Sequence, residues 1–254
     1  MIDVNCFLGA YPFHAGVEAT ADTLLARMDR IGVDVGWVSH LSAVFWRDPT
    51  EGNAALVEAA SAPRLRPVFA VHPGFAGWEL VLDEAVRAQG PCVRADPMFY
   101  GIEPAGAEMV AVANGCAERG LPLLMAVKLE DLRQRHPNDS AGDLPPWAVR
   151  TLMRRHPELK LLITHADRDF IEQVHFGSTP AEASRILWDI SWIWGPPEDH
   201  LALLLETVGI DRFCFGTATP MRLAENAVAK LDLLDISRAD RLAIEHGNAE
   251  RFTA

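Results

Sequence analysis

The 254-residue chain has fewer positive than negative side chains, with 23 lysines and arginines against 35 aspartates and glutamates. The net charge of −12 argues against nucleic acid or an anionic membrane as a partner, since their phosphates would be repelled. No apolar run approaches the roughly 18 residues that a membrane span requires. The chain also begins without a basic region followed by an apolar stretch, so we expect no secretory signal.

Cysteine is scarce as well, and the four residues present include no C-x-x-C pair. Three of Cys6, Cys92, Cys116 and Cys214 lie in apolar, strand-like runs, where buried free thiols are expected. We therefore expect a soluble cytoplasmic protein with reduced thiols. No Ser/Gly-rich linker or low-complexity tract divides the chain, which favours one domain over residues 1–254, with two small domains as the alternative.

What the sequence does contain is a regular alternation of short apolar runs with amphipathic segments, the pattern of repeated βα units. In residues 200–208, for example, apolar side chains recur with the spacing of one helix face. Most runs are apolar without alternation, as in strands that are buried on both faces. The expected strands are residues 2–7, 34–40, 66–72, 91–96, 122–127, 160–165, 186–191 and 212–217.

Eight strands with helices between them predict an α/β protein with the TIM (β/α)8 barrel fold and an extra C-terminal helix over residues 237–252. At 49% hydrophobic residues, the chain is able to bury one large core. A doubly wound open sheet is the alternative, but no G-x-G-x-x-G follows the first strand.

In such barrels the chemistry lies at the carboxyl ends of the strands. The residues found there are polar or ionisable to an extent that a scaffold does not need. They are Asn5, Ser39, His40, His72, Arg94, Asp96, Lys128, His165, Asp167, Asp189 and Ser191.

Five segments together resemble one family, the amidohydrolase-related (amidohydrolase 2) branch of the amidohydrolase superfamily. Residues 2–7 resemble a first strand that reads Ile-Asp-x-His-x-His, and residues 120–126 resemble a strand that ends in a ligand histidine. Residues 157–165 resemble the strand "P-x-lk-x-x-x-x-His", and residues 209–220 resemble "G-x-dR-x-x-fGTD-x-P". The fifth segment, Asn248–Phe252, resembles the helix that closes the chain in this family.

The resemblance implies the barrel fold and a metal-dependent hydrolase site, but most of the implied metal ligands are missing. Asn5 and Phe7 stand where the resemblance places two histidines, Ala126 replaces a third, and Ala218 replaces the aspartate that binds metal and acts as general base. Of the metal ligands that the resemblance implies, only the histidine at the end of residues 157–165, His165, is kept. One imidazole cannot hold a catalytic cation, which needs about three protein ligands. We therefore predict a degenerate site with no metal and no cofactor.

The remaining strand-end residues each have two interpretations. His165 is a candidate acid/base, aided by Asp96 or Asp189, or else a hydrogen-bonded histidine at the barrel mouth. Arg94 is a candidate clamp for a substrate carboxylate, or else the ion-pair partner of Asp96. Lys128 is a candidate substrate-binding cation or nucleophile, or else a solvated loop lysine.

Other candidate binding residues are aromatic or lie in a long loop. His72 either faces the pocket or caps a turn. Trp192, with its neighbours Trp188 and Trp194, forms either a wall for a ligand ring or part of the core or a subunit contact. The polar stretch 130–143 is too long for an ordinary loop, and we expect a lid or an interface arm.

Three functions follow from these residues. The first is a hydrolase or lactonase that acts on a small carboxylated substrate without metal, with His165 as acid/base. The second is a non-catalytic relative that binds a small molecule or a protein partner. The third keeps a metal on a rearranged set, His40, His72 and His165. A homodimer is possible for a barrel of this kind.

Overall fold

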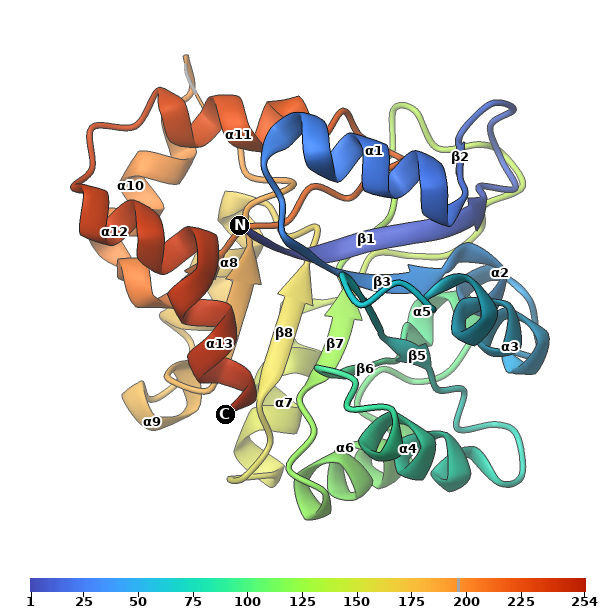
Figure 1. Ribbon diagram of the computed structural model, residues 1–254. Helices are drawn as coiled ribbons and strands as arrows, with labels where there is room; N and C mark the ends of the chain where they lie inside the picture. The colour runs from blue at the N-terminus through green and yellow to red at the C-terminus, as the bar shows by residue number, and fades with distance from the viewer. Residues whose placement is uncertain (196) are drawn as a thin grey trace.

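The computed structural model describes residues 1–195 and 197–254 and has an α/β fold with parallel strands joined by helices. Figure 1 shows the strands in the middle of the molecule and the helices around them. Each predicted strand is confirmed within a few residues. The strands are β1 (Ile2–Ala10), β2 (Glu18–Ala19), β3 (Val35–His40), β4 (Leu65–Pro67), β5 (Phe69–Ala70), β6 (Val93–Arg94), β7 (Leu123–Ala126), β8 (Leu161–Thr164), β9 (Ile186–Asp189) and β10 (Phe213–Cys214).

The strands form two sheets, in the orders β2-β1-β3-β4 and β5-β6-β7-β8-β9-β10. All neighbours are parallel except β2, which returns from β1 as an antiparallel hairpin. The predicted third strand, 66–72, is divided into β4 and β5. β4 pairs with β3, and Val68 N continues this ladder by donating to Val38 O over 2.8 Å, whereas β5 pairs with β6 on the other side.

The first strand also contacts the chain beyond β10. Val4 N donates to Phe215 O over 3.0 Å, Ala218 N donates to Asn5 O over 2.9 Å, and Phe7 N donates to Thr219 O over 2.8 Å. The buried Asp3 carboxylate adds two contacts, accepting from Thr217 N at 3.0 Å and from Thr217 Oγ1 at 2.5 Å. The two ends of the strand series therefore lie side by side.

Helices follow most strands and cover the outside of the sheets (Figure 1). They are α1 (Ala21–Ile31), α2 (Leu41–Phe45), α3 (Thr50–Ala59), α4 (Trp78–Arg87), α5 (Pro97–Tyr100), α6 (Ala107–Glu118), α7 (Pro146–Arg155), α8 (Arg168–His175), α9 (Pro180–Ala183), α10 (His200–Thr207), α11 (Glu225–Asp232), α12 (Arg238–Leu242) and α13 (Asn248–Thr253), with a 3₁₀ turn η1 (Ile210–Arg212) and a π-helical turn η2 (Ala243–Gly247).

Local sequence explains individual helix ends. In α1, Thr20 and Thr23 form a capping box, and Gly32 ends the helix in the left-handed conformation at φ 74°. The predicted amphipathic segment 200–208 is confirmed as α10, which buries Leu201, Leu204 and Leu205. The predicted tail helix 237–252 is present as α12, η2 and α13. Within the described residues, no helix combines the length and the apolar character needed to cross a membrane.

The core has a large layer between strands and helices and a smaller cluster inside the strands. The inner cluster takes a residue from each of the eight predicted strands: Val4, Trp37, Val68, Cys92, Leu124, Leu162, Leu187 and Cys214. Ala249 of α13 joins the same cluster. The four cysteines are buried free thiols, as expected.

The contact between Asp3 and Thr217 makes a prediction about stability. Thr217→Val keeps the shape of the side chain but removes the hydroxyl that donates to the buried carboxylate. We expect the free energy of unfolding to fall by about 1–3 kcal/mol, because one carboxylate oxygen loses its donor. Urea unfolding followed by circular dichroism measures it. Thr151→Val on α7, whose hydroxyl bonds only within its own helix, is the control, and an equal loss in both variants would contradict the prediction.

Candidate ligand-binding site

The carboxyl ends of the strands bring a group of polar side chains into direct contact. We call this group the strand-end network, and all of its members are buried. It consists of Asn5 from β1, Ser39 from β3, Arg94 and Asp96 from β6 and its end, His165 after β8, and Asp189 from β9.

Asn5 is the centre of the network. Its amide nitrogen lies 2.9 Å from His165 Nε2 and donates to Asp189 Oδ2 at 2.9 Å. Its carbonyl oxygen accepts from Arg94 Nη2 at 3.1 Å. An amide has two N–H donors and one acceptor oxygen, so both donors and the oxygen of Asn5 are engaged by these three partners. The residue that stands in place of an expected metal ligand thus joins a cation, an imidazole and a carboxylate.

Arg94 has a partner at each of its guanidinium nitrogens. Nε donates to Ser39 Oγ at 3.0 Å, Nη1 pairs with Asp96 Oδ2 at 3.2 Å, and Nη2 bonds Asn5. The ring of Phe7 lies against the guanidinium, with 4.6 Å from Cζ to the ring centroid. The side chain is 1% exposed. The ion pair with Asp96, one of the two interpretations of Arg94, is therefore present, and the predicted carboxylate clamp would need this arrangement to open.

His165 is held as a neutral imidazole. Its Nδ1 lies 2.6 Å from Lys128 O, which only accepts, so the proton is on Nδ1 and Nε2 accepts from Asn5. Burial lowers the pKa of His165 well below its usual value, and the charge of Arg94 acts in the same direction. The rings of Phe7 and Trp192 flank the imidazole, at centroid distances of 6.3 and 5.6 Å.

The two candidate carboxylates hold backbone as well as side chains. Asp96 Oδ1 accepts from Ala126 N at 2.8 Å, and Asp189 Oδ1 accepts from His165 N at 3.0 Å. Burial raises the pKa of Asp189, although the hydrogen bonds that it accepts act against this rise. Sequence reasoning correctly brought His165, Asp96 and Asp189 to one place. His165 contacts Asp189 directly, whereas Asp96 is joined to them through Arg94 and Asn5, and none of the three lines the mouth pocket.

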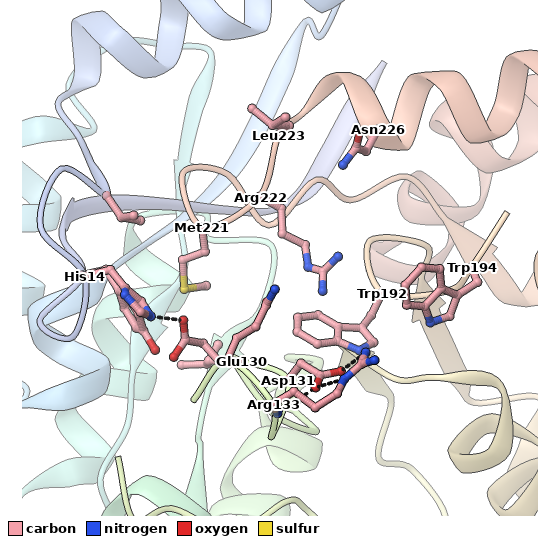
Figure 2. Close-up of a pocket in the computed structure, with 14 residues that line it drawn as sticks. His14, Glu130, Asp131, Arg133, Trp192, Trp194, Met221, Arg222, Leu223 and Asn226 are labelled. Carbon is pink, nitrogen blue, oxygen red and sulfur yellow. Dashed lines mark hydrogen bonds and ion pairs between the residues drawn. The ribbon is translucent and has the colours of Figure 1, made fainter. Parts of the chain in front are cut away.

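An open pocket lies beyond the network, past the ends of β1, β7 and β9. We call it the mouth pocket; its volume is about 270 Å³ (Figure 2). Its lining comes from four chain segments: Tyr11, His14 and Val17; Leu129–Asp131, Arg133 and Gln134; Trp192 and Trp194; Met221–Leu223 and Asn226. Trp192 contacts both the pocket and His165. Trp188, by contrast, is core, and Trp194 is 54% exposed.

Arg222 is one of two arginines that line the mouth pocket, and the other, Arg133, is paired with Asp131. The Arg222 Cζ lies 3.5 Å from the centroid of the Trp192 ring, and Figure 2 shows the guanidinium over that ring. Its Nε is buried without a hydrogen-bond partner, and within the described residues no carboxylate lies at ion-pair distance from it. Burial lowers the pKa of Arg222, while Asp189 and Asp131 oppose that shift from a distance. A guanidinium that is half desolvated and unpaired is suited to bind an anion.

The opposite wall of the mouth pocket is acidic. His14 Nε2 pairs with Glu130 Oε1 at 2.7 Å (Figure 2). The second oxygen of Glu130 and the hydroxyl of Tyr11 are both buried without a hydrogen bond of normal geometry. Burial, followed by the effect of Glu130, raises the pKa of Tyr11. Both atoms are buried, and the effect of Glu130 on the pKa of Tyr11 shows that they lie near each other.

A second pocket of about 320 Å³ adjoins the first, and we call it the side pocket. The two pockets share Trp192, Trp194, Arg222 and Asn226. The remaining lining of the side pocket is Ile193, Gly195, Ala229, Lys230 and Leu233.

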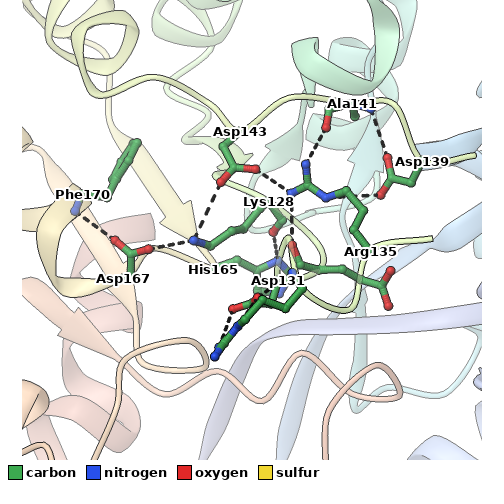
Figure 3. A network of polar contacts seen from close by, with 11 residues as sticks. Lys128, Asp131, Arg135, Asp139, Ala141, Asp143, His165, Asp167 and Phe170 are labelled. Carbon is green, nitrogen blue, oxygen red and sulfur yellow. Dashed lines mark hydrogen bonds and ion pairs between the residues drawn. The ribbon is translucent and has the colours of Figure 1, made fainter. Parts of the chain in front are cut away.

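The stretch 130–143, expected to be a lid or an interface arm, is a loop that contributes residues 130, 131, 133 and 134 to the mouth pocket, and Figure 3 shows the polar contacts within it. Arg135 braces it from within, donating to Ala141 O at 2.7 Å, Glu130 O at 3.1 Å and Asp143 Oδ1 at 2.5 Å. Lys128, which opens the loop, pairs with Asp167 at 2.7 Å and is 12% exposed. Lys128 is therefore held in an ion pair with Asp167, and it is not the solvated loop lysine expected under one interpretation of the sequence.

His72 lies in a different place from the network. Its Nδ1 accepts from Gly74 N at 3.1 Å, so it caps a turn, and its ring stacks on Tyr100 at a centroid distance of 4.1 Å. It does line a pocket, of about 800 Å³, that shares no residue with the mouth pocket. His72 therefore caps a turn and also lines a pocket, but this pocket is not the one that Trp192 and Arg222 line.

The donor set does not fit a metal ion. Across residues 1–195 and 197–254, no three His, Cys, Asp or Glu side chains are grouped to hold one. The rearranged set is wrong for this reason. His40 Nδ1 accepts from Ser42 N, His72 Nδ1 accepts from Gly74 N, and both nitrogens of His165 have other partners.

Sequence reasoning missed Arg222, Lys230, Tyr11, His14 and Glu130. Each lies at least one residue beyond the strand end that was considered, in a loop or the following helix. The signal that would have found Arg222 is its position five residues after Thr217, directly past the end of the last strand.

The chain belongs to the amidohydrolase family, whose model matches residues 13–252. It shares its fold with several solved structures. One is a 2,6-dihydroxybenzoate decarboxylase from Rhizobium, at 13% identity and a TM-score of 0.71, covering 100% of this chain and 99% of that one. Another is a dihydroxybenzoic acid decarboxylase from Polaromonas with bound manganese and 2-nitroresorcinol, at 14% identity and a TM-score of 0.70, covering 99% and 96%.

A third is a probable 2-pyrone-4,6-dicarboxylic acid hydrolase from Acinetobacter baumannii with citric acid bound. It has 11% identity and a TM-score of 0.70, and the match covers 99% of this chain and 98% of that one. Comparison with curated protein sequences gives no match.

The central role of Asn5 makes a prediction. Asn5→Asp replaces the two N–H donors with an oxygen that faces Asp189 Oδ2 and the lone pair of His165 Nε2. We expect a loss of about 3–5 kcal/mol in the free energy of unfolding, because a further buried carboxylate enters without donors. Chemical denaturation measures the loss. Asn138→Asp, the same change at an exposed position, should stay within about 0.5 kcal/mol of the parent. Similar losses in the two variants would show that the buried contacts of Asn5 add no more to stability than an exposed asparagine does.

Proposed function

We propose that this chain binds a small carboxylated molecule that contains a ring, in the mouth pocket between Arg222 and Trp192. The observation that carries this is the guanidinium of Arg222, which is stacked on Trp192 and has no anionic partner in the described residues. A carboxylate satisfies such a fork with two parallel hydrogen bonds. An aromatic ring finds a flat partner in the indoles of Trp192 and Trp194.

The comparisons support a ligand of this class. The Rhizobium and Polaromonas relatives are named as decarboxylases of dihydroxybenzoic acids, and the Acinetobacter relative carries citric acid and is named for a dicarboxylic acid substrate. A mouth pocket of about 270 Å³ suits a single substituted ring.

The proposal includes a single domain over residues 1–254 and a closed (β/α)8 barrel. Closure is supported by the hydrogen bonds between β1 and residues 215–219 and by the inner cluster that draws on all eight predicted strands. In a barrel this cluster is a packed layer of side chains below the mouth. The strand-end network then lies above that layer, and the mouth pocket lies above the network.

The proposal further holds that the ligand binds without a metal ion. The strand-end network already contains a cation, Arg94, which pairs with Asp96 and bonds Asn5. A second positive charge among these groups would meet repulsion from the guanidinium, and His165 has no free lone pair to offer it.

Hydrolysis by His165 is a second candidate function, and one observation favours it. The indole of Trp192 lies 5.6 Å from the His165 ring and also lines the mouth pocket. A rotation of that indole would open the imidazole to a ligand, and Nε2 would accept a proton as a general base once the amide of Asn5 released its hydrogen bond to that nitrogen. Asp189, which accepts from the His165 backbone N–H, would then keep its place.

Replacement of Arg222 tests the binding function. Arg222→Met keeps an apolar contact with Trp192 but removes the guanidinium. We expect the dissociation constant for 2,6-dihydroxybenzoate to rise about 10- to 100-fold, the effect of losing a charged hydrogen-bond pair. Titration calorimetry measures it, with resorcinol as the ligand that lacks the carboxylate.

Arg133→Met is the matched control, because Arg133 lines the same pocket but is already paired with Asp131 at 2.8 Å. Its affinity should stay within about twofold of the parent, and dialysis against a chelator should change nothing. Equal weakening in both variants, or loss of binding after chelation, would refute the proposal.

The hydrolase candidate predicts turnover that depends on His165. Lactones, esters and amides of small carboxylic acids are the substrates to screen. In His165→Asn, which tolerates the positive φ of 58° at this position, we expect the rate to fall by about 10² or more if His165 is the acid/base. His175→Asn on α8 is the control. Turnover that is indifferent to the His165 change would remove this residue from catalysis.

A further inference from the structure

Lys230, on α11, lines the side pocket in surroundings unlike those of the other two lysines. Its Nζ donates to two backbone carbonyls, Ile190 O and Ser191 O, both at 2.9 Å. Within the described residues it has no carboxylate at ion-pair distance. Lys128 is paired with Asp167, and Lys160 donates to backbone carbonyls at the C-terminal helix.

The contacts of Lys230 suit a neutral amine. A neutral amine has two N–H donors and one lone pair, so two carbonyls use both donors and leave the lone pair free. Burial lowers the pKa of Lys230 from 10.5 to about 8, and the charge of Arg222 acts in the same direction while Asp189 opposes it. About a tenth of this lysine is therefore unprotonated at pH 7, and about half at pH 8.

Room for this side chain depends on a glycine. A Cβ at Gly195 would lie 3.1 Å from Lys230 Cγ, closer than an ordinary contact. The lysine stem thus crosses the side pocket beside Gly195, among Trp192, Trp194 and Leu233. An apolar lining of this kind disfavours the ammonium and suits the uncharged amine.

We propose that Lys230 is a reactive amine that forms an imine with a carboxylated aldehyde or ketone, whose carboxylate pairs with Arg222. Arg222 lines both pockets, so an anion held there has its remaining atoms beside the side pocket. The inference rests on the proposed binding of a carboxylate by Arg222. It narrows the ligand class from carboxylates in general to oxo acids.

The chemistry is balanced without any further reagent. The Nζ lone pair attacks the carbonyl carbon, the C=O π electrons move to oxygen, and a proton passes from nitrogen to that oxygen to give a carbinolamine. The hydroxyl then leaves with a second proton as water, and a C=N bond replaces the C–N bond. Hydrolysis of the imine by the reverse steps returns the free lysine.

Reductive trapping tests the proposal. The whole protein is treated with 4-carboxybenzaldehyde and sodium cyanoborohydride, which reduces an imine to a stable secondary amine, and the labelled peptides are identified by mass spectrometry. We expect Lys230 to be labelled at least 10-fold faster than Lys128, Lys160 or the N-terminal amine. The rate should rise with pH up to about 8, the pKa of Lys230, and level off above it.

Two comparisons assign the contribution of Arg222. Benzaldehyde lacks the carboxylate and should label Lys230 about 10-fold more slowly, and Arg222→Met should abolish the difference between the two aldehydes. Lys230→Met should lose the label yet keep the affinity for 2,6-dihydroxybenzoate. Since the labelling of the unmodified protein needs no variant, a folding defect in Lys230→Met would not decide the matter.

The outcomes separate the two proposals. Label spread evenly over the three lysines and the N-terminus, with benzoate-type ligands still bound through Arg222, would overturn the imine and leave the binding function. Label concentrated on Lys230 but equal for both aldehydes would overturn the pairing of the carboxylate with Arg222, and with it the oxo-acid assignment.

Discussion

The structure depends on the amide of Asn5, which joins three strands by its contacts with Arg94, His165 and Asp189. The groups it links would be costly to bury alone, because an unpaired ion in the protein interior loses its hydration. Asn5 gives the imidazole and one carboxylate their donors and takes a hydrogen bond from the guanidinium. Each buried group is therefore satisfied only while the others stay in place.

A network that satisfies itself has little capacity for a ligand. Removing Arg94 from Asp96 to bind a substrate carboxylate would leave Asp96 buried without its partner, and that loss would offset the gain. Within the part of the chain that the structure describes, a cation without a carboxylate partner is found instead at Arg222, which lines the mouth pocket. Binding capacity in this chain is thus found one layer beyond the strand ends.

The fold was largely predictable because each strand is an apolar run, and burial on both faces leaves that mark in the sequence. The division of the third strand at Pro67 and the hairpin strand β2 were not foreseen, since β2 has two residues and no pattern of its own. For the site, the strand-end rule correctly brought together Asp96, His165 and Asp189. Whether they face a ligand depends on how Phe7 and Trp192 pack at the strand ends. The spacing of residues along the sequence does not specify this packing.

Trp192 is where the three parts of the site meet. Its ring lies near His165, carries Arg222 at 3.5 Å, has Lys128 Nζ at 5.7 Å from its centroid, and lines both pockets. A ligand that draws the Arg222 guanidinium away from the indole would weaken the contact that holds this ring over the imidazole. The neutral state of His165 depends partly on that cover, since burial is the first cause of its lowered pKa. If a carboxylate binds Arg222 as proposed, occupancy of the mouth pocket would be coupled to the protonation of the buried network through the side chain of Trp192.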